Sequence, residues 1–264
     1  MTMALRLYNT ATRDVKEFTT LEKGKARMYM CGPTVYNYAH IGNFRSFGLA
    51  DIVRRVLTYC GYDGSHTMNL TDIDDKTIRD SQKEGKTLKE FTEFYTDKFF
   101  EDYDMLNCLR PTTTTKATDY IKKMIALVET LIKKGVAYEK NGSVYYSIEK
   151  FEGYGALVGL CVDDLQQNAD GRLNDDDEYD KDNARDFALW KAYEENDGEN
   201  YWESPWGRGR PGWHLECSVM SMDTLGETFD IHAGGVDLKF PHHTNEIAQS
   251  VAATEKDYAK WWVH

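Results

Sequence analysis

The spacing of apolar residues predicts the first elements of the chain. Residues 26–30 read as a short strand that runs into a turn signal at 31–34. From 43 to 59 the apolar side chains fall at helical intervals, and Gly61 follows as a stop signal. Residues 65–70 form a second strand candidate. The order strand, loop, helix, strand, loop predicts a right-handed βαβ unit in a parallel sheet, with its functional loops at the carboxyl ends of the strands.

The middle of the chain changes character. Thr87 and Glu90 form a capping box that opens a helix reaching to about residue 106, and another helix is predicted over 118–134. Residues 136–146 then read as a hairpin around an Asn-Gly turn. An antiparallel hairpin does not continue a parallel sheet, and polar, acidic and glycine-rich sequence follows it.

These shifts predict how the domain is organised. A chain of 264 residues is long enough for one or two domains with a sizeable core. We predict a first half over 1–118, an insertion over 119–205 and a second half over 206–264 in which the sheet resumes. The expected class is therefore α/β.

Composition and charge argue against some classes of function. The 32 basic and 44 acidic residues leave a net charge of -12, which argues against a basic nucleic-acid-binding face over the whole chain but leaves room for a local strip. Part of the excess is the acidic run 174–180, typical of a solvated loop. The sequence has no 18-residue apolar run and no signal-peptide core over 1–10, so we expect a cytoplasmic protein with no membrane span.

The segment 31–43 joins the first strand to the first helix and is a candidate phosphate site. A helix start carries free backbone N–H groups and partial positive charge. Gly42 permits close approach of an anion, and His40 and Asn43 can donate hydrogen bonds to it. A plain strand-to-helix turn with a surface histidine has the same pattern, so the residues alone leave both readings open.

A second group has the composition of a metal site. Pro241 suits a first helical turn, so a helix is predicted to begin there, with His242 and Glu246 one turn apart on one face. Thiolates from Cys31 and Cys217 would complete a set of two sulfurs, one nitrogen and one oxygen, which suits Zn²⁺ better than Mg²⁺ or Ca²⁺. The alternative is that the histidines cap a helix and the cysteines belong to the core.

Six segments taken together resemble cysteinyl-tRNA synthetases. They occur in the family's order and spread over most of the chain: MCGPTVY at 30–36, HIGN at 40–43, NLTDIDDK at 69–76, ALWK at 188–191, GWHLEC at 212–217 and FPHHTNEIAQS at 240–250. Each segment is weak alone, but their joint occurrence by chance is negligible.

The resemblance implies a fold and an activity. The fold is a Rossmann-like catalytic domain of the first synthetase class, with a parallel sheet split by a connective insertion. The activity is the formation of cysteinyl-adenylate from cysteine and ATP, followed by transfer of cysteine to tRNA(Cys). The resemblance also implies one Zn²⁺ per chain and Mg²⁺ with ATP, and we expect a monomer.

By motif match, the resemblance also assigns the metal ligands and the ATP contacts. Cys31, Cys217, His242 and Glu246 correspond to the zinc ligands. A substrate thiolate would make a fifth ligand, so we expect Glu246 to be the weak or movable one.

The remaining assignments concern ATP and the cysteine pocket. The segment 40–43 corresponds to a signature usually written His-Ile-Gly-His, in which Asn43 replaces the last histidine. The residues implied are His40 and Asn43 as catalytic groups, the ATP-binding His40, Gly42, Asn43, Gly235 and Asp237, and the cysteine-pocket residues Gly32, Thr71, Trp213 and His232.

In the resembling family, a Lys-Met-Ser-Lys-Ser loop and a helical anticodon-binding part follow the position of His264. We therefore expect this chain to bind zinc and cysteine, to activate cysteine poorly, and to lack most contacts with tRNA(Cys). Two alternatives remain: a cysteine ligase acting on an amino sugar, as in mycothiol synthesis, and a non-catalytic cysteine-binding paralogue. The intact ATP motif argues against the latter.

Overall fold

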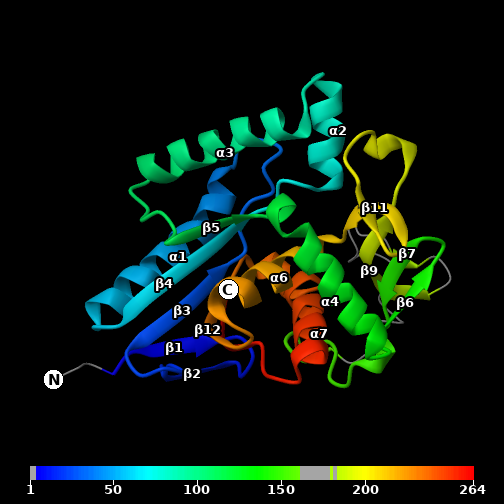
Figure 1. Ribbon diagram of the computed structural model, residues 1–264. Coiled ribbons are helices and arrows are strands. Elements are labelled where there is room, and N and C mark those ends of the chain that lie inside the picture. Colours follow the sequence, from blue (N-terminus) through cyan, green and yellow to red (C-terminus); the bar gives the residue numbers. More distant parts are fainter. Residues whose placement is uncertain (1–3, 161–178, 181–182) are drawn as a thin grey trace.

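Two sheets organise the chain. The computed structural model describes residues 4–160, 179–180 and 183–264. The first sheet lies on the left of Figure 1, and all its neighbouring strands are parallel. Its strands in spatial order are β13 (Ala259–Val263), β12 (Phe229–Ala233), β3 (Lys25–Met30), β4 (Asp63–Leu70) and β5 (Thr113–Lys116). The parallel α/β class predicted from the sequence is confirmed.

The predicted βαβ unit is formed by β3, α1 (Ile41–Tyr59) and β4. The helix begins two residues earlier than the apolar spacing predicts, because the side chain of His40 caps it. It ends at the cap residue Cys60, and Gly61 follows with φ +87°. That left-handed conformation is the reason glycine suits this stop position.

Both faces of the parallel sheet are covered. In β3, Met28 and Met30 share a core with the aromatic residues of α1 and α3 (Leu88–Met105). The alternate residue Tyr29 belongs instead to the core that includes α6 (Trp213–Leu225) and α7 (His242–Thr254). This alternation follows from the two-residue period of a strand, and coverage of both faces is typical of parallel sheets.

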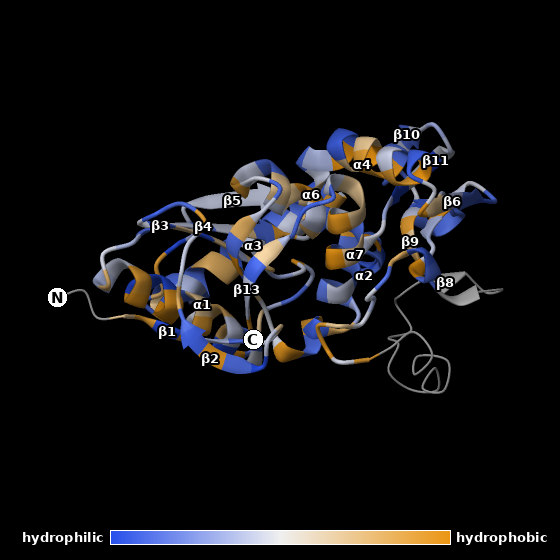
Figure 2. Ribbon diagram, turned by 90° about the horizontal axis from the view of Figure 1, so that it is seen from below, coloured by the Kyte–Doolittle hydropathy of each residue, from blue (hydrophilic) through white to orange (hydrophobic). Residues whose placement is uncertain are grey.

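The helix predicted over 118–134 consists of two parts. A 3₁₀ turn, η1 (Ala117–Tyr120), precedes α4 (Ile121–Lys133). The carboxylate of Asp72 accepts hydrogen bonds from the Thr118 backbone N–H and hydroxyl, and so holds this turn against the loop after β4. In Figure 2, α4 shows both hydrophobic and hydrophilic residues, as expected for a helix with one face on a core.

The second sheet lies on the right of Figure 1 and is antiparallel. The predicted hairpin is confirmed, with Asn141 and Gly142 at φ 55° and 82°. Residues 174–178 of the predicted acidic loop lie outside the described residues. The predicted boundaries of the insertion, between 118 and 119 and between 205 and 206, remain a prediction. The strands in spatial order are β10 (Trp202–Ser204), β11 (Gly207–Pro211), β9 (Asn183–Ala192), β7 (Ser143–Tyr146) and β6 (Ala137–Lys140), with β8 (Tyr179–Asp180) beside β9.

The remaining elements support these two sheets. The side chain of Asn9 accepts a hydrogen bond from the Trp262 N–H and donates one to the Lys260 carbonyl, so the first hairpin is tied to β13. Within the described residues, no helix is long and apolar enough to cross a membrane. These further elements are β1 (Arg6–Asn9), β2 (Asp14–Glu17), α2 (Asp75–Lys83), η2 (Ile148–Lys150), η3 (Glu195–Asp197) and η4 (Val236–Lys239).

The strand order places the functional edge of the sheet. From β3 the next strand is β4 on one side, whereas from β12 the next strand is β13 on the other side. Strands β3 and β12 are neighbours, so the order reverses between them. Open parallel sheets bind ligands beyond the carboxyl ends of the strands at such a switch point. Cys31 and Gly234 follow directly after these two strands.

Candidate active site and metal centre

A cavity of about 470 Å³ opens at this edge of the sheet. It is lined from the loop after β3, from the start of α1, from the start of α6 and from the segment after β12. The antiparallel sheet also contributes, through β9 and β11. The sequence-predicted residues that line it are Cys31, Gly32, His40, Asn43, Trp213, Gly235 and Asp237.

The start of α1 forms one wall of this cavity. The Asn43 backbone N–H donates to His40 Nδ1 at 3.3 Å, and the His40 N–H donates to Asn43 Oδ1 at 3.0 Å. Because Nδ1 accepts a hydrogen bond, the ring proton of neutral His40 is on Nε2. Both side chains are exposed, and a Cβ at Gly42 would come within 2.9 Å of the His40 ring. The arrangement offers hydrogen-bond donors to an anion at a helix start.

The loop after β3 is fixed by a polar chain. The Gly32 N–H donates to Asn69 Oδ1 at 2.9 Å, and the Asn69 amide donates to Thr71 Oγ1 at 3.2 Å. Gly32 and Trp213 reach the cavity, whereas Thr71 and His232 are buried and are not among the described residues that line it. Two of the four residues predicted for the cysteine pocket therefore line the cavity.

The four predicted metal ligands meet at the base of this region. Cys31, Cys217, His242 and Glu246 are all buried, and one ligand atom of each lies within 4.8 Å of the others. Cys31 Sγ is 3.8 Å from Cys217 Sγ and 3.6 Å from Glu246 Oε1, and His242 Nε2 is 3.2 Å from Glu246 Oε1. In a tetrahedral zinc site these edges are about 3.8, 3.6 and 3.4 Å. The spacing of the donor atoms therefore fits zinc.

The environment of His242 prepares it as a ligand. Its Nδ1 lies 2.7 Å from His214 Nδ1, while its Nε2 is buried, 3.2 Å from Glu246 Oε1, and has no hydrogen-bond partner among the described residues. Burial lowers the pKa of His242 to about 3, so the imidazole is neutral near pH 7. Trp213 packs on the same ring with centroids 4.1 Å apart. A neutral imidazole oriented through its other nitrogen is the form that binds metals.

The charge of Glu246, the one quartet member that is ionised near pH 7, also favours a cation. Burial raises the pKa of the Cys31 thiol well above its ordinary value and raises that of Cys217. Burial also raises the pKa of Glu246, but His232 and His242 outweigh that effect and leave it lowered. Among the described residues, the basic side chains near the Glu246 carboxylate are His232, His242 and His243, and burial keeps the last two neutral near pH 7. A fully buried carboxylate without a lysine or arginine partner is costly, and a bound cation would relieve that cost.

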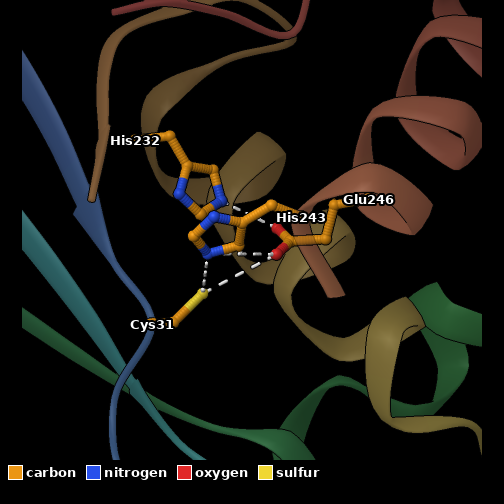
Figure 3. A group of neighbouring side chains, drawn as sticks. All are labelled: Cys31, His232, His243 and Glu246. Atoms are coloured by element: carbon orange, nitrogen blue, oxygen red, sulfur yellow. Dashed lines mark hydrogen bonds and ion pairs between the residues drawn. The ribbon is translucent and has the colours of Figure 1, made fainter. Parts of the chain in front are cut away.

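A second group overlaps the first. Cys31, His232, His243 and Glu246 also place one ligand atom each within 4.8 Å of one another, and Figure 3 shows them converging. His243 Nε2 lies 3.4 Å from Cys31 Sγ, and its Nδ1 lies 2.7 Å from His264 Nε2. Since both groups share Cys31 and Glu246, His232 and His243 surround the quartet rather than form a separate centre.

The sequence analysis did not assign roles to several residues of this region. His214 and His243 lie within the quoted motifs, so their positions next to Trp213 and His242 were a usable signal. Tyr258 and His264 carry no such signal. Their contacts arise only because β13 pairs with β12.

Comparison with solved structures shows the fold. Methionyl-tRNA synthetase of Mycobacterium tuberculosis, in complex with methionyl-adenylate, superposes with a TM-score of 0.68 at 10% identity, covering 91% of this chain and 56% of that one. A putative arginyl-tRNA synthetase of Campylobacter jejuni gives 0.56 at 12% identity, covering 92% and 54%. The chain thus has the Rossmann-like fold of class I aminoacyl-tRNA synthetase catalytic domains.

Comparison at the level of sequence shows the family. The chain belongs to the family described as tRNA synthetases class I (C) catalytic domain, whose model matches residues 17–264. It is 52% identical over 257 residues to the cysteine–tRNA ligase of Brachyspira hyodysenteriae, covering 97% of this chain and 54% of that relative. The cysteine–tRNA ligase of Methanosarcina mazei is 54% identical over 262 residues, covering 98% and 55%. The chain spans about half the length of the curated relatives it matches.

Proposed function

We propose that this chain carries the catalytic part of a cysteine–tRNA ligase, which forms cysteinyl-adenylate from cysteine and ATP and transfers cysteine to tRNA(Cys). The observation that carries the proposal is the quartet of ligand atoms within 4.8 Å of one another, beside a cavity that the capped start of α1 also lines. The cysteine–tRNA ligases that resemble this chain support the same activity.

The quartet accounts for selection of the amino acid. Cys31, Cys217, His242 and Glu246 would hold one Zn²⁺. When bound, zinc supplies a soft cation that prefers sulfur to oxygen and lowers the pKa of a thiol, which separates cysteine from serine. Shape alone separates such near-isosteric substrates weakly. Trp213, which packs on His242 and lines the cavity, would form the wall beside the substrate side chain.

The residues at the start of α1 account for activation. The carboxylate of cysteine attacks the α-phosphate of ATP, and the bond to pyrophosphate breaks. Negative charge grows on the phosphate oxygens, so the catalytic contribution is positioning and donation of hydrogen bonds. His40 Nε2–H and the Asn43 side chain would supply donors, with Gly42 allowing close approach. Gly235 and Asp237, which also line the cavity, would face the adenosine, and Mg²⁺ would accompany ATP.

Substitution of His40 tests this division of labour. We expect His40→Ala to lower cysteinyl-adenylate formation in a single turnover by about 10²- to 10³-fold, the usual effect of removing one transition-state donor. Zinc content should stay at one ion per chain, because His40 stands outside the quartet. Radiolabelled adenylate and metal analysis of the same samples measure both.

The unmodified chain provides the reference for this test. Cysteine, but not serine, should bind to the zinc-loaded chain, and removal of zinc by a chelator should abolish the preference. Loss of zinc from His40→Ala would show that its role is misassigned. Transfer to tRNA and to an amino sugar is compared separately, and modification of the amino sugar alone would refute the tRNA ligase proposal.

A further inference from the structure

The two oxygens of Glu246 are held in different ways. Oε1 faces the other ligand atoms, 3.6 Å from Cys31 Sγ and 3.2 Å from His242 Nε2. Oε2 instead lies 2.8 Å from His232 Nε2 and accepts a hydrogen bond of 2.9 Å from the Tyr258 hydroxyl. One end of the carboxylate is therefore free to act as a ligand while the other end is engaged.

Tyr258 is itself firmly placed. It directly precedes β13, is 2% exposed, and packs edge-on against Phe229 and His232 with centroids 5.1 and 5.6 Å apart. Its hydroxyl lies 2.6 Å from Ser221 Oγ of α6. The carboxylate only accepts hydrogen bonds and is nearer to the Tyr258 hydroxyl, at 2.9 Å, than the Cys217 carbonyl is, at 3.5 Å, so we assign the hydroxyl proton to Glu246. Ser221 is then the donor in the 2.6 Å contact between the two hydroxyls, which is shorter than its 3.2 Å distance to the Ser218 carbonyl.

We propose that Tyr258 is a positioning residue of the metal centre, whose hydroxyl fixes Oε2 of Glu246 so that the carboxylate presents Oε1 alone to the metal. This rests on the proposed zinc quartet. A carboxylate with both oxygens unrestrained can bind a metal through either or both. Groups that hydrogen-bond a ligand from outside the coordination sphere orient it and affect affinity in this way.

Tyr258 is a better position than His232 for a substitution that tests this inference. Both contact Oε2, but the resemblance to cysteinyl-tRNA synthetases assigns His232 to the cysteine pocket, so its replacement would mix two effects. Tyr258 is not among the described residues that line the cavity. Replacing it by phenylalanine removes one oxygen atom and leaves the ring contacts in place.

The test compares zinc affinity of the full 264-residue chain and its variants by competition with a chromogenic chelator. Tyr258→Phe should weaken zinc binding by about 10- to 100-fold. The matched control is Tyr146→Phe, because Tyr146 is equally buried and its hydroxyl donates to the Ala248 carbonyl of the same helix α7 at 3.0 Å. Its zinc affinity should remain within twofold of the unmodified chain.

Cobalt provides a readout that a purely structural role would not move. In the Co²⁺-loaded chain, Tyr258→Phe should alter the visible d–d bands, which report coordination number, whereas Tyr146→Phe should leave them unchanged. Ser221→Ala, which keeps the tyrosine, should weaken zinc binding by about 2- to 5-fold through the lost hydrogen bond to its hydroxyl. This variant preserves the test if Tyr258→Phe does not fold.

Three results would overturn the inference. Unchanged zinc affinity and cobalt bands in Tyr258→Phe, or in Ser221→Ala where only that variant folds, would show that Oε2 needs no anchor. Equal weakening in Tyr258→Phe and Tyr146→Phe would assign the effect to packing of α7. Failure of the unmodified chain to bind one zinc ion would remove the proposed function together with the inference.

Discussion

At the residue scale, the lack of a Cβ atom at Gly32 lets the loop after β3 approach β4 closely. A Cβ at Gly32 would lie 1.7 Å from the Asn69 carbonyl oxygen, so any side chain at this position would clash with the backbone of β4. Gly32 stands next to Cys31, so the same contact holds a predicted metal ligand in place. A glycine here serves close backbone approach, and its φ is not in the left-handed region.

Gly32→Ala should therefore lower the free energy of unfolding by about 3 kcal/mol, since the strand ends must separate to admit a methyl group. Urea denaturation followed by circular dichroism measures this. Gly48→Ala is the control, because Gly48 lies in α1 with open space around its Cβ position. That change should stabilise the chain by about 0.5 to 1 kcal/mol. A similar response of the two variants would contradict the argument.

At the element scale, burial explains which elements the apolar pattern missed. In α6, nine of the 13 residues are buried, and they include His214, Glu216 and two serines. A helix enclosed on most sides has no polar face, so helical periodicity is weak in its sequence. By contrast, α1 and α3 each keep an exposed face and were predicted nearly to their ends. The 3₁₀ turn before α4 depends on Asp72, which is distant in sequence.

Strand β4 carries a buried histidine with a consequence for stability. Burial, with a smaller effect of Arg54, lowers the pKa of His66 to about 4. Both ring nitrogens are buried and have no hydrogen-bond partner among the described residues. In the unfolded chain a histidine has a pKa near its ordinary value, about 6.5. The folded state therefore binds fewer protons than the unfolded state between pH 6.5 and 4.

His66 should contribute a loss of about 3 kcal/mol of stability as the pH falls from 7 to 4, because protons then favour the unfolded chain. We expect His66→Leu to remove that part of the pH dependence. Urea unfolding at pH 7 and at the lowest pH where both proteins fold gives the difference. Parallel pH dependence in the two proteins would mean that His66 does not titrate in this range.

At the scale of the whole molecule, a buried ion-pair network joins the two sheets. Asp75, the first residue of α2, pairs with Lys191 of β9 at 2.8 Å and with Arg210 of β11. Arg210 also pairs with Asp197 at 2.9 Å. The two cations are 9% and 8% exposed, whereas Asp75 is 37% exposed. The antiparallel sheet is thereby fastened to the start of α2, beside the cavity.

Asp75→Ala should destabilise the chain by about 2 kcal/mol. It leaves Lys191 nearly buried without its carboxylate, although solvent at the partly exposed Asp75 position compensates in part. Glu203→Ala breaks the exposed pair with Arg208 in the same sheet and should cost within about 0.5 kcal/mol. Thermal unfolding compares the two variants, and equal shifts would contradict a special role for the network.

The sequence by itself determined the parallel α/β class, the first βαβ unit, the hairpin, the candidate residues at the start of α1, and His242 and Glu246 as a candidate ligand pair. These follow from short-range patterns, since capping, strand alternation and the spacing of His242 and Glu246 act within a few residues. The tertiary structure decided that Cys31 and Cys217 meet, that His214 orients His242, and that Tyr258 engages Glu246. Such contacts depend on how β3, β12 and β13 pair and how α6 and α7 pack on them, and no local periodicity encodes that pairing.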